Sequence, residues 1–361
     1  FHSVKGHVVT SAIEHDAVLR ATDGHDHTLV APDEHGFISA ESIRAAIRPD
    51  TRLVSVAAAN NELGTVQPLR AIAAVIAGER ERRKTAGDTT PIYFHSDASQ
   101  GMGQLDLHVS RLGLDMLTLN AAKMYGPKQV ALLWVSPDAR LEPMIVGGGQ
   151  ENGLRSGTEN VAGVIGFARA LELVIKGRKS EIERLTELAA TIRERVAEAF
   201  PDAVFSGSRK HHLSGFVHVS FPGIDAERLV FSLERRNVLV ATGSACAANK
   251  NTRSHVLTAI GLSDELADGS LRLTLGHLST AENTKRAADI IIEEVGKEQA
   301  RLAPHPQYPD GSDRSEPAPV TPAAIPQRSH NYSSGMSKAS GTTPEQSSGR
   351  QSIGDGAQGK S

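Results

Sequence analysis

Short apolar runs alternate with amphipathic stretches along the first 300 residues of the chain. The apolar runs are bounded by polar, glycine or proline residues, which is typical of buried strands. Leu69–Lys84, in contrast, has Ile72, Val75 and Ile76 at helical spacing and predicts an amphipathic helix. The predicted strands are Thr51–Ala58, Pro91–His95, Met116–Leu119 and Val130–Val135. Strands separated by helical stretches favour a doubly wound α/β domain with a mostly parallel sheet.

The second part of the pattern begins with long helical stretches. Two helices are predicted first, and further helices then alternate with the apolar runs Phe216–Phe221 and Val238–Ala241, which we expect to be strands. The predicted helices are Val161–Ile175, Glu181–Ala199, Ala226–Arg235 and Ala281–Leu302. We therefore expect a large domain over residues 1–165, and an interdomain helix with a smaller α+β domain over residues 166–302.

Residues 303–361 form a third region, which is rich in Pro, Ser and Gly and contains few large aliphatic side chains. Such a segment cannot bury enough apolar area to offset the entropy of ordering its backbone. We expect it to be a disordered tail.

Composition narrows the classes of function. The 39 Lys and Arg residues nearly balance the 42 Asp and Glu residues, which argues against direct nucleic-acid or membrane-surface binding. A single cysteine, Cys246, excludes an intramolecular disulfide framework and a cysteine-rich zinc site, and we expect no metal. The chain has neither a long apolar run nor a signal-peptide pattern, so we expect a soluble, cytoplasmic protein. Because it begins at Phe1 instead of Met, we also expect a fragment.

Polar side chains follow three successive predicted strands. These segments are Asn60–Glu62, Ser96–Gln100 and Asn120–Lys123. In open α/β sheets, ligands bind outside the carboxyl ends of the strands, so we expect the three segments to converge on one crevice. Each segment alone is a weak signal, because an Asp after a strand is commonly a helix N-cap.

Two residues in small, polar surroundings are candidates for covalent chemistry. Lys123 precedes a Tyr-Gly-Pro turn, and a partly desolvated site would lower its pKa and free the amine to form a Schiff base. An ordinary surface lysine is the alternative. Cys246 lies in a run of small and polar residues typical of an exposed loop, with Lys250 and Arg253 nearby to favour the thiolate. A small buried core cysteine is the alternative there.

Seven stretches, in order along the chain, resemble the cysteine desulfurases of the NifS/IscS type. These are class V aminotransferase-like enzymes with the fold-type I α/β architecture, and they use pyridoxal 5′-phosphate. The stretches are EHDAV (14–18), NNELGTVQ (60–67), HSDASQ (95–100), AAKMYGPK (121–128), GGGQENGLRSGTEN (147–160), GSAC (243–246) and SLRLTLG (270–276). The resemblance extends from Gly6 to about Leu302, and the spacing after Cys246 is similar to that of the subgroup with a long cysteine loop.

The resemblance implies a role for each matching residue. Lys123 would bind the cofactor covalently, Asp97 would pair with its pyridinium nitrogen, and Gln100 would donate to its phenolic oxygen. His15 would stack on the ring and shuttle protons, although a helix-start histidine is the alternative. The remaining roles concern the phosphate and the substrate: Asn120 would replace a phosphate-binding hydroxyl, Thr158 would reach the partner subunit's cofactor phosphate in a homodimer, and Asn61 and Arg272 would hold the substrate carboxylate.

The same resemblance implies a reaction and its partners. The Lys123 amine or His15 would remove the Cα proton of L-cysteine, and the Cys246 thiolate would attack the substrate sulfur. The products would be alanine and a persulfide on Cys246. A sulfur-acceptor protein, either an iron–sulfur scaffold or a carrier for tRNA thiolation, would then take the sulfur.

Two departures from the family pattern affect the cofactor site. The family has Ser-x-His-Lys around the Schiff-base lysine, whereas this chain has Asn120 and Ala122 in place of Ser and His. We also expect the family's N-terminal phosphate-binding loop to be missing from this sequence. Two alternatives to the desulfurase stay open: another class V enzyme such as a selenocysteine lyase, and a non-catalytic scaffold homologue of iron–sulfur assembly. The two departures favour the scaffold.

Overall fold

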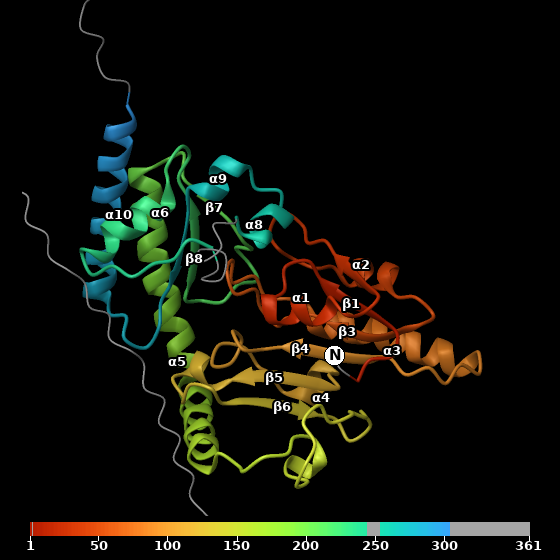
Figure 1. Cartoon of the computed structure of the whole chain (residues 1–361). Helices are drawn as coiled ribbons and strands as arrows, with labels where there is room; N and C mark the ends of the chain where they lie inside the picture. The colour runs from red at the N-terminus through yellow and green to blue at the C-terminus, as the bar shows by residue number, and fades with distance from the viewer. Residues whose placement is uncertain (2, 244–252, 304–361) are drawn as a thin grey trace, which may run out of the picture. The chain divides into compact units, whose positions relative to one another are not determined.

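A six-stranded sheet is formed by the first 135 residues (Figure 1). The structure, a computed structural model, describes residues 1, 3–243 and 253–303. The strand order is β2-β1-β3-β4-β5-β6, and every neighbouring pair is parallel except β5 and β6. The strands are β1 (His7–Ser11), β2 (His27–Val30), β3 (Thr51–Ser55), β4 (Tyr93–Asp97), β5 (Met116–Asn120) and β6 (Ala131–Val135). The predicted mostly parallel α/β sheet is confirmed, whereas β1 and β2 were not predicted.

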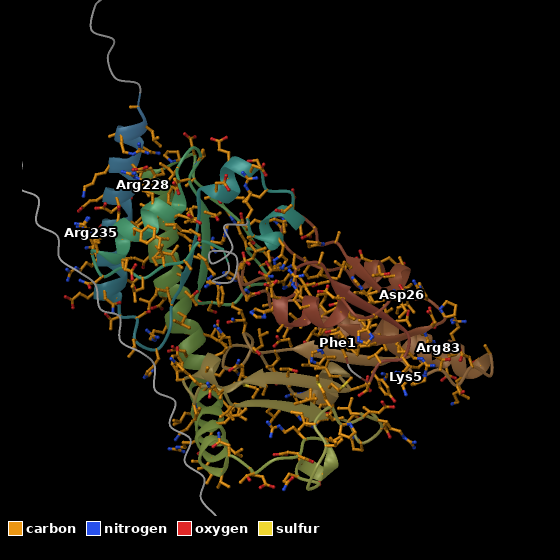
Figure 2. All side chains as sticks on the ribbon, in the orientation of Figure 1. Phe1, Lys5, Asp26, Arg83, Arg228 and Arg235 are labelled. Atoms are coloured by element: carbon orange, nitrogen blue, oxygen red, sulfur yellow. The ribbon has the colours of Figure 1, made fainter. Side chains whose placement is uncertain are left out.

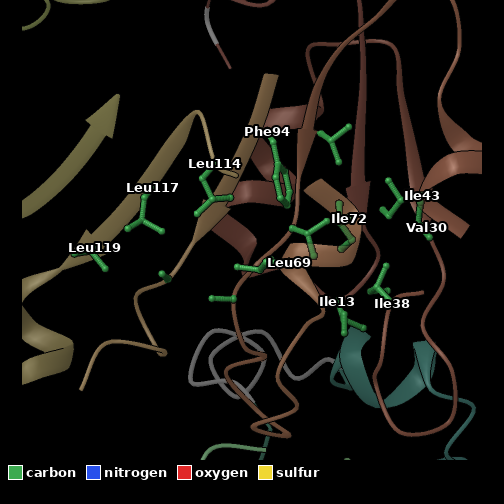
Figure 3. Close-up of a cluster of buried hydrophobic side chains, with 14 of the residues drawn as sticks. Ile13, Val30, Ile38, Ile43, Leu69, Ile72, Phe94, Leu114, Leu117 and Leu119 are labelled. Carbon is green, nitrogen blue, oxygen red and sulfur yellow. The ribbon is translucent and has the colours of Figure 1, made fainter. Parts of the chain in front are cut away.

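The helices that follow these strands supply the core of the sheet. In α3 (Leu69–Thr85), the side chains of Leu69, Ile72 and Ile76 are buried in one cluster with Phe94 of β4 (Figure 3). The spacing of these residues places them on one face of the helix, which is why this helix was predictable. The other short elements here are α1 (Asp16–Thr22), α2 (Ala40–Ala46), α4 (Val109–Leu112), and the 3₁₀ helices η1 (Ala121–Met124) and η2 (Glu151–Gly153).

Arg83 of α3 holds the loops at the amino ends of β3 and β4 (Figure 2). Its guanidinium is buried and donates to the backbone carbonyls of Arg48, Thr51 and Thr90, and its Nε donates to Glu79. A buried charge is tolerated when it is paired and fully hydrogen-bonded. The amino ends of β3 and β4 are therefore occupied by structural contacts. A ligand site is expected at the opposite edge, where the strands have their carboxyl ends.

A single helix, α5 (Val161–Ala199), replaces the two helices predicted over this region. The prediction was wrong because the Lys176–Ser180 segment contains Gly177 but no proline, and one glycine lowers helix stability without breaking the helix. Phe167 and Ala170 pack in the core of the large sheet, while Ile192 and Val196 pack in the second core. Figure 1 shows the helix running from one sheet toward the other.

The second sheet has three antiparallel strands in the order β7-β8-β9. Its core is formed with α5, α6 and α10, which bury Ile192, Leu229 and Ile291 against Val217 and Leu271. The elements are β7 (Val204–Phe205), β8 (Phe216–Ser220), α6 (Ala226–Glu234), α8 (His255–Ala259), α9 (Asp264–Asp268), β9 (Ser270–Thr274) and α10 (Ala281–Leu302). No helix among the described residues is both long and apolar enough to cross a membrane.

The strand expected at Val238–Ala241 is not formed. Ala241 makes an isolated bridge to Arg272 of β9, and Leu239 is 80% exposed. Asn237 turns the chain with a φ of 61°, so the segment reaches β9 only at its last residue. The tail predicted over 303–361 lies outside the described residues except for Ala303, and the proposed division at residue 165 stays a prediction.

Candidate functional site

The carboxyl ends of β3, β4 and β5 lie side by side. Ala58 donates its N–H to the carbonyl of Asp97 at 2.8 Å, and Ala98 donates to the carbonyl of Thr118 at 2.9 Å. The backbone is therefore paired across all three strand ends, which brings the three polar segments predicted from the sequence to one edge of the sheet.

Asp97 is the last residue of β4 and is partly buried. Its Oδ1 accepts the N–H of Ser99 at 2.9 Å, which orients the carboxylate at the start of the next turn. Gln100 follows in that turn, which is closed by a hydrogen bond from the N–H of Gly101 to the carbonyl of Ala98. A carboxylate and an amide thus lie three residues apart on a turn at the strand end, where a ligand is expected.

Lys123 lies in η1, directly after β5. The side chain of Asn120 caps this turn by accepting the N–H of Ala122 at 3.0 Å. Ala121 and Met124 are buried, while Lys123 between them is exposed. The partly desolvated setting predicted for Lys123 is thus not provided by the described residues, because the turn buries the apolar neighbours on either side and leaves the amine outside.

His15 is the N-cap of α1, and its Nδ1 accepts the N–H of Ala17 at 3.1 Å. The helix-start role is therefore observed, and the exposed ring remains available for the stacking role that the resemblance implies. Thr158 is exposed in the segment before α5. Cys246 lies outside the described residues, between Gly243 and Arg253.

Arg272 and Asn61 are brought together from opposite ends of the sequence. Arg272 lies on β9, and its Nη1 donates to the backbone carbonyl of Asn61 at 3.2 Å. Burial lowers the pKa of Arg272, and the nearby carboxylate of Glu62 opposes that shift. The structure therefore places together the two residues predicted to hold a substrate carboxylate, although the bond uses the backbone of Asn61 and not its amide.

Sequence reasoning assigned no role to Glu14, which is buried beside this edge. Its Oε1 accepts hydrogen bonds from Ser11 Oγ at 2.5 Å and from the N–H of Ala57 at 2.9 Å. Burial raises the pKa of this carboxyl to about 7, the two hydrogen bonds oppose the shift, and the charge of Asp97 adds to it. The motif EHDAV contains Glu14, but only the fold shows that it joins the turn after β1 to the end of β3.

Comparison with known proteins gives consistent matches. Residues 2–286 match the aminotransferase class-V family. A cysteine desulfurase IscS from Dictyoglomus turgidum is 38% identical over 311 residues, which cover 84% of this chain and 76% of that protein. A cysteine desulfurase IscS from Clostridium botulinum is 38% identical over 298 residues, covering 81% of this chain and 71% of that protein.

Solved structures agree with these sequence matches. A NifS-like protein superposes with a TM-score of 0.72 at 29% identity, covering 81% of this chain and 76% of its own. The structure of SspA in complex with cysteine superposes with a TM-score of 0.61 at 38% identity, covering 75% of this chain and 74% of its own.

Proposed function

The chain belongs to the aminotransferase class-V family, and from that membership we propose that it is a cysteine desulfurase. It would convert L-cysteine to L-alanine and transfer the sulfur to Cys246. The observation that carries the proposal is the pairing of the three strand ends, which supports a common site for Asp97 and Lys123. The relatives named cysteine desulfurase, and the cysteine complex of SspA, support the choice of substrate.

The chemistry of the side chains at this edge fits pyridoxal 5′-phosphate. Asp97 offers a carboxylate for the pyridinium nitrogen, Gln100 an amide donor for the phenolic oxygen, and exposed Lys123 an amine for the aldehyde carbon. His15 would lie against the ring. Asn120 uses its side-chain oxygen to cap η1, so only its amide N–H₂ would be offered to the phosphate. When bound, the cofactor supplies an electron sink that stabilises negative charge at the substrate Cα.

The residues of this chain would carry the remaining steps. Arg272 would grip the substrate carboxylate with its planar guanidinium, beside Asn61. The Lys123 amine or His15 would take the proton from the substrate Cα and return a proton to the product. The Cys246 thiolate would attack the substrate sulfur, so that one S–S bond forms while the C–S bond breaks. Cysteine and one thiol give alanine and one persulfide, so atoms and electrons balance without an outside oxidant.

A second copy of this chain is the proposed subunit partner, with Thr158 reaching the cofactor phosphate of that copy. Exposed apolar side chains support this proposal. They occur in the segment before α5 and in its first turns, where Met144 and Val146 are each 77% exposed and Ile165 is 65% exposed. Large exposed apolar side chains that are close along the chain are consistent with an interaction surface. A sulfur-acceptor protein, serving iron–sulfur clusters or tRNA thiolation, is the proposed second partner.

The test is to add pyridoxal 5′-phosphate to the purified chain, reduce with borohydride, and map the modified lysine by mass spectrometry. We expect a yellow protein, in which reduction attaches the cofactor permanently to Lys123. With L-cysteine, we expect equal amounts of alanine and Cys246 persulfide. Cys246→Ala should keep the colour and lose the persulfide. Colourless protein that stays free of cofactor would contradict the proposal and favour a non-catalytic scaffold.

A further inference from the structure

Glu62, which lies two residues after the start of the NNELGTVQ motif, is fully buried. Its Oε2 accepts a hydrogen bond from Ser254 Oγ at 2.5 Å, across 192 residues of sequence. Within the part of the chain that the structure describes, its other oxygen, Oε1, has no hydrogen-bond partner. A buried carboxyl is costly to desolvate, so its retention here calls for a role beyond filling space.

Ser254 closes one end of the segment that carries Cys246. It is the N-cap of α8, and its Oγ accepts the N–H groups of Val256 and Leu257 at 3.2 and 3.3 Å. The hydroxyl proton is the one donor of this side chain, and it is given to Glu62. The serine therefore has both its donor and its acceptor capacity satisfied.

The residues on either side of Ser254 are attached as well. Arg253 pairs with Asp268, with Nε–Oδ1 at 2.7 Å, and with Asp264 at 2.7 Å. His255 hydrogen-bonds through Nε2 to the backbone carbonyl of Glu14 at 2.9 Å. Three consecutive residues thus fix the chain at the start of α8.

Gly243 lies at the other end of the same segment and also meets Glu62. A Cβ added to Gly243 would lie 3.2 Å from Glu62 Oε2 and 3.1 Å from Ser254 Cβ. The glycine has a φ of 46°, in the left-handed region that favours glycine. Gly243 and Ser254 are therefore packed together on one carboxyl group.

Arg272 is the third neighbour of this carboxyl. Burial raises the pKa of Glu62, while the Ser254 hydrogen bond and then the charges of His255 and Arg272 lower it. Arg272 Nε is buried and has no hydrogen-bond partner among the described residues. The residue proposed to grip the substrate carboxylate is therefore electrostatically linked to the residue that holds the ends of the Cys246 segment.

We propose that Glu62 is a positioning residue, which holds both ends of the Cys246-bearing segment beside Arg272. One carboxyl group then fixes Gly243 and Ser254, which lie on either side of the Cys246 segment, near the group proposed to grip the substrate. The consequence for turnover rests on the proposed desulfurase function. The tether itself does not rest on that function. It rests on the Glu62–Ser254 hydrogen bond, the packing of Gly243 against Glu62 and the nearby charge of Arg272.

The test uses Cys246 as its own probe, because it is the sole cysteine of the chain. The rate of its alkylation by iodoacetamide is measured in cofactor-free protein, where no turnover is needed. We expect Ser254→Ala and Glu62→Ala each to speed alkylation by about threefold or more, because losing the Glu62–Ser254 bond frees the start of α8, which follows Cys246 in the sequence. Glu62→Gln keeps an acceptor for Ser254 and should stay near the wild-type rate.

Ser263→Ala is the matched control. Ser263 caps α9 by accepting the N–H of Leu266, so this variant removes an N-cap hydroxyl without touching Glu62. Equal alkylation rates in Ser254→Ala and Ser263→Ala would overturn the proposal. Should Glu62→Ala fail to fold, the Ser254 and Ser263 variants still decide the question.

Turnover is measured separately in the same variants. Ser254→Ala should lower the rate of Cys246 persulfide formation from L-cysteine, and Ser263→Ala should not. A wild-type protein that releases no alanine would contradict the proposed desulfurase, whereas altered alkylation in that same protein would still support the tether. Normal alanine release with unchanged alkylation in every variant would refute the tether alone.

Discussion

The strand-end edge that carries Lys123 and the cluster around Glu62 are held together in different ways. At the strand-end edge, the side chains of His15, Asp97 and Asn120 each accept an N–H from two residues further along the chain. At the cluster, the bonds join residues that are 192 and 211 positions apart. In the first region each side chain is oriented by its own local turn, whereas in the second the side chains are held by residues far away in the sequence.

Because the two regions are held in different ways, substitutions in them should have different effects on the reaction and on stability. Lys123 is exposed and contributes little to packing, so its loss should affect the reaction without affecting the fold. Glu62 is buried and joins distant segments, so changes there should alter position and stability together. Substitutions at Lys123, Glu14, His95 and His218 test this contrast.

Lys123→Ala should have the largest effect. We expect alanine release from L-cysteine to fall on the order of 10³-fold or more, because both the covalent anchor and a base are lost. The free energy of unfolding of the cofactor-free protein should change by about 0.5 kcal/mol or less, as measured by urea denaturation. Lys128→Ala, at another exposed lysine five residues on, is the control and should retain activity. A large loss of stability in Lys123→Ala would contradict the contrast.

Glu14→Gln tests the residue that connects the two regions, through its carboxyl to Ala57 and through its carbonyl to His255. The pKa of Glu14 is raised from its ordinary 4.5 to about 7, so between these values the folded protein binds more protons than the unfolded chain. The free energy of unfolding therefore falls as pH rises from about 4.5 to about 7. In Glu14→Gln this decrease in the free energy of unfolding, which amounts to up to about 3 kcal/mol, should be absent.

Urea denaturation of the wild type and of Glu14→Gln from pH 4.5 to pH 8 gives the difference in their free energies of unfolding at each pH. The subtraction is necessary because His95 and His218, whose pKa values burial lowers to about 4, act in the opposite direction. Each is neutral in the fold and costs stability as pH falls. A difference between wild type and Glu14→Gln that does not vary with pH would show that Glu14 is ionised throughout.

Those two histidines give the smallest predicted effect. His95 bonds to Ser55 at 2.8 Å and to Thr118 at 2.9 Å, whereas neither ring nitrogen of His218 has a partner among the described residues. His95→Leu leaves two hydroxyls without their partner and should cost about 1–3 kcal/mol. His218→Leu should be neutral or stabilising. Thermal unfolding of both variants checks this, and equal losses would contradict it.

Much of the fold was predictable because long elements carry a clear period. The α10 helix is observed over the predicted residues, and α3 extends one residue beyond its predicted end. The break predicted within α5 was wrong, because a lone glycine is a weak signal when both flanking stretches have the same helical period. The prediction of a strand at Val238–Ala241 was wrong, because an apolar run does not show how many of its residues can pair with a neighbouring strand. Here only Ala241 pairs with β9.

From the residues alone, the candidate site was predictable only where it is local, whereas Asn61 and Arg272 were predicted from the family resemblance. Asp97, Gln100 and Lys123 were named from their positions after strands, since topology gathers parallel strand ends at one edge. Glu62 was noted in such a segment but given no role, and Ser254 was given none either. Their relation depends on the packing of the start of α8 against the turn that follows β3, which no sequence period encodes.

The 39-residue α5 helix gives the molecule a mechanical constraint. At about 1.5 Å per residue, it extends roughly 58 Å, and its two halves pack in different cores. One residue inserted near Gly177 would rotate everything beyond it by about 100°. The apolar face would then fit one core and miss the other. The helix therefore fixes the orientation of the second sheet relative to the large sheet. This sets the position of Arg272 on β9 relative to Lys123, which follows β5.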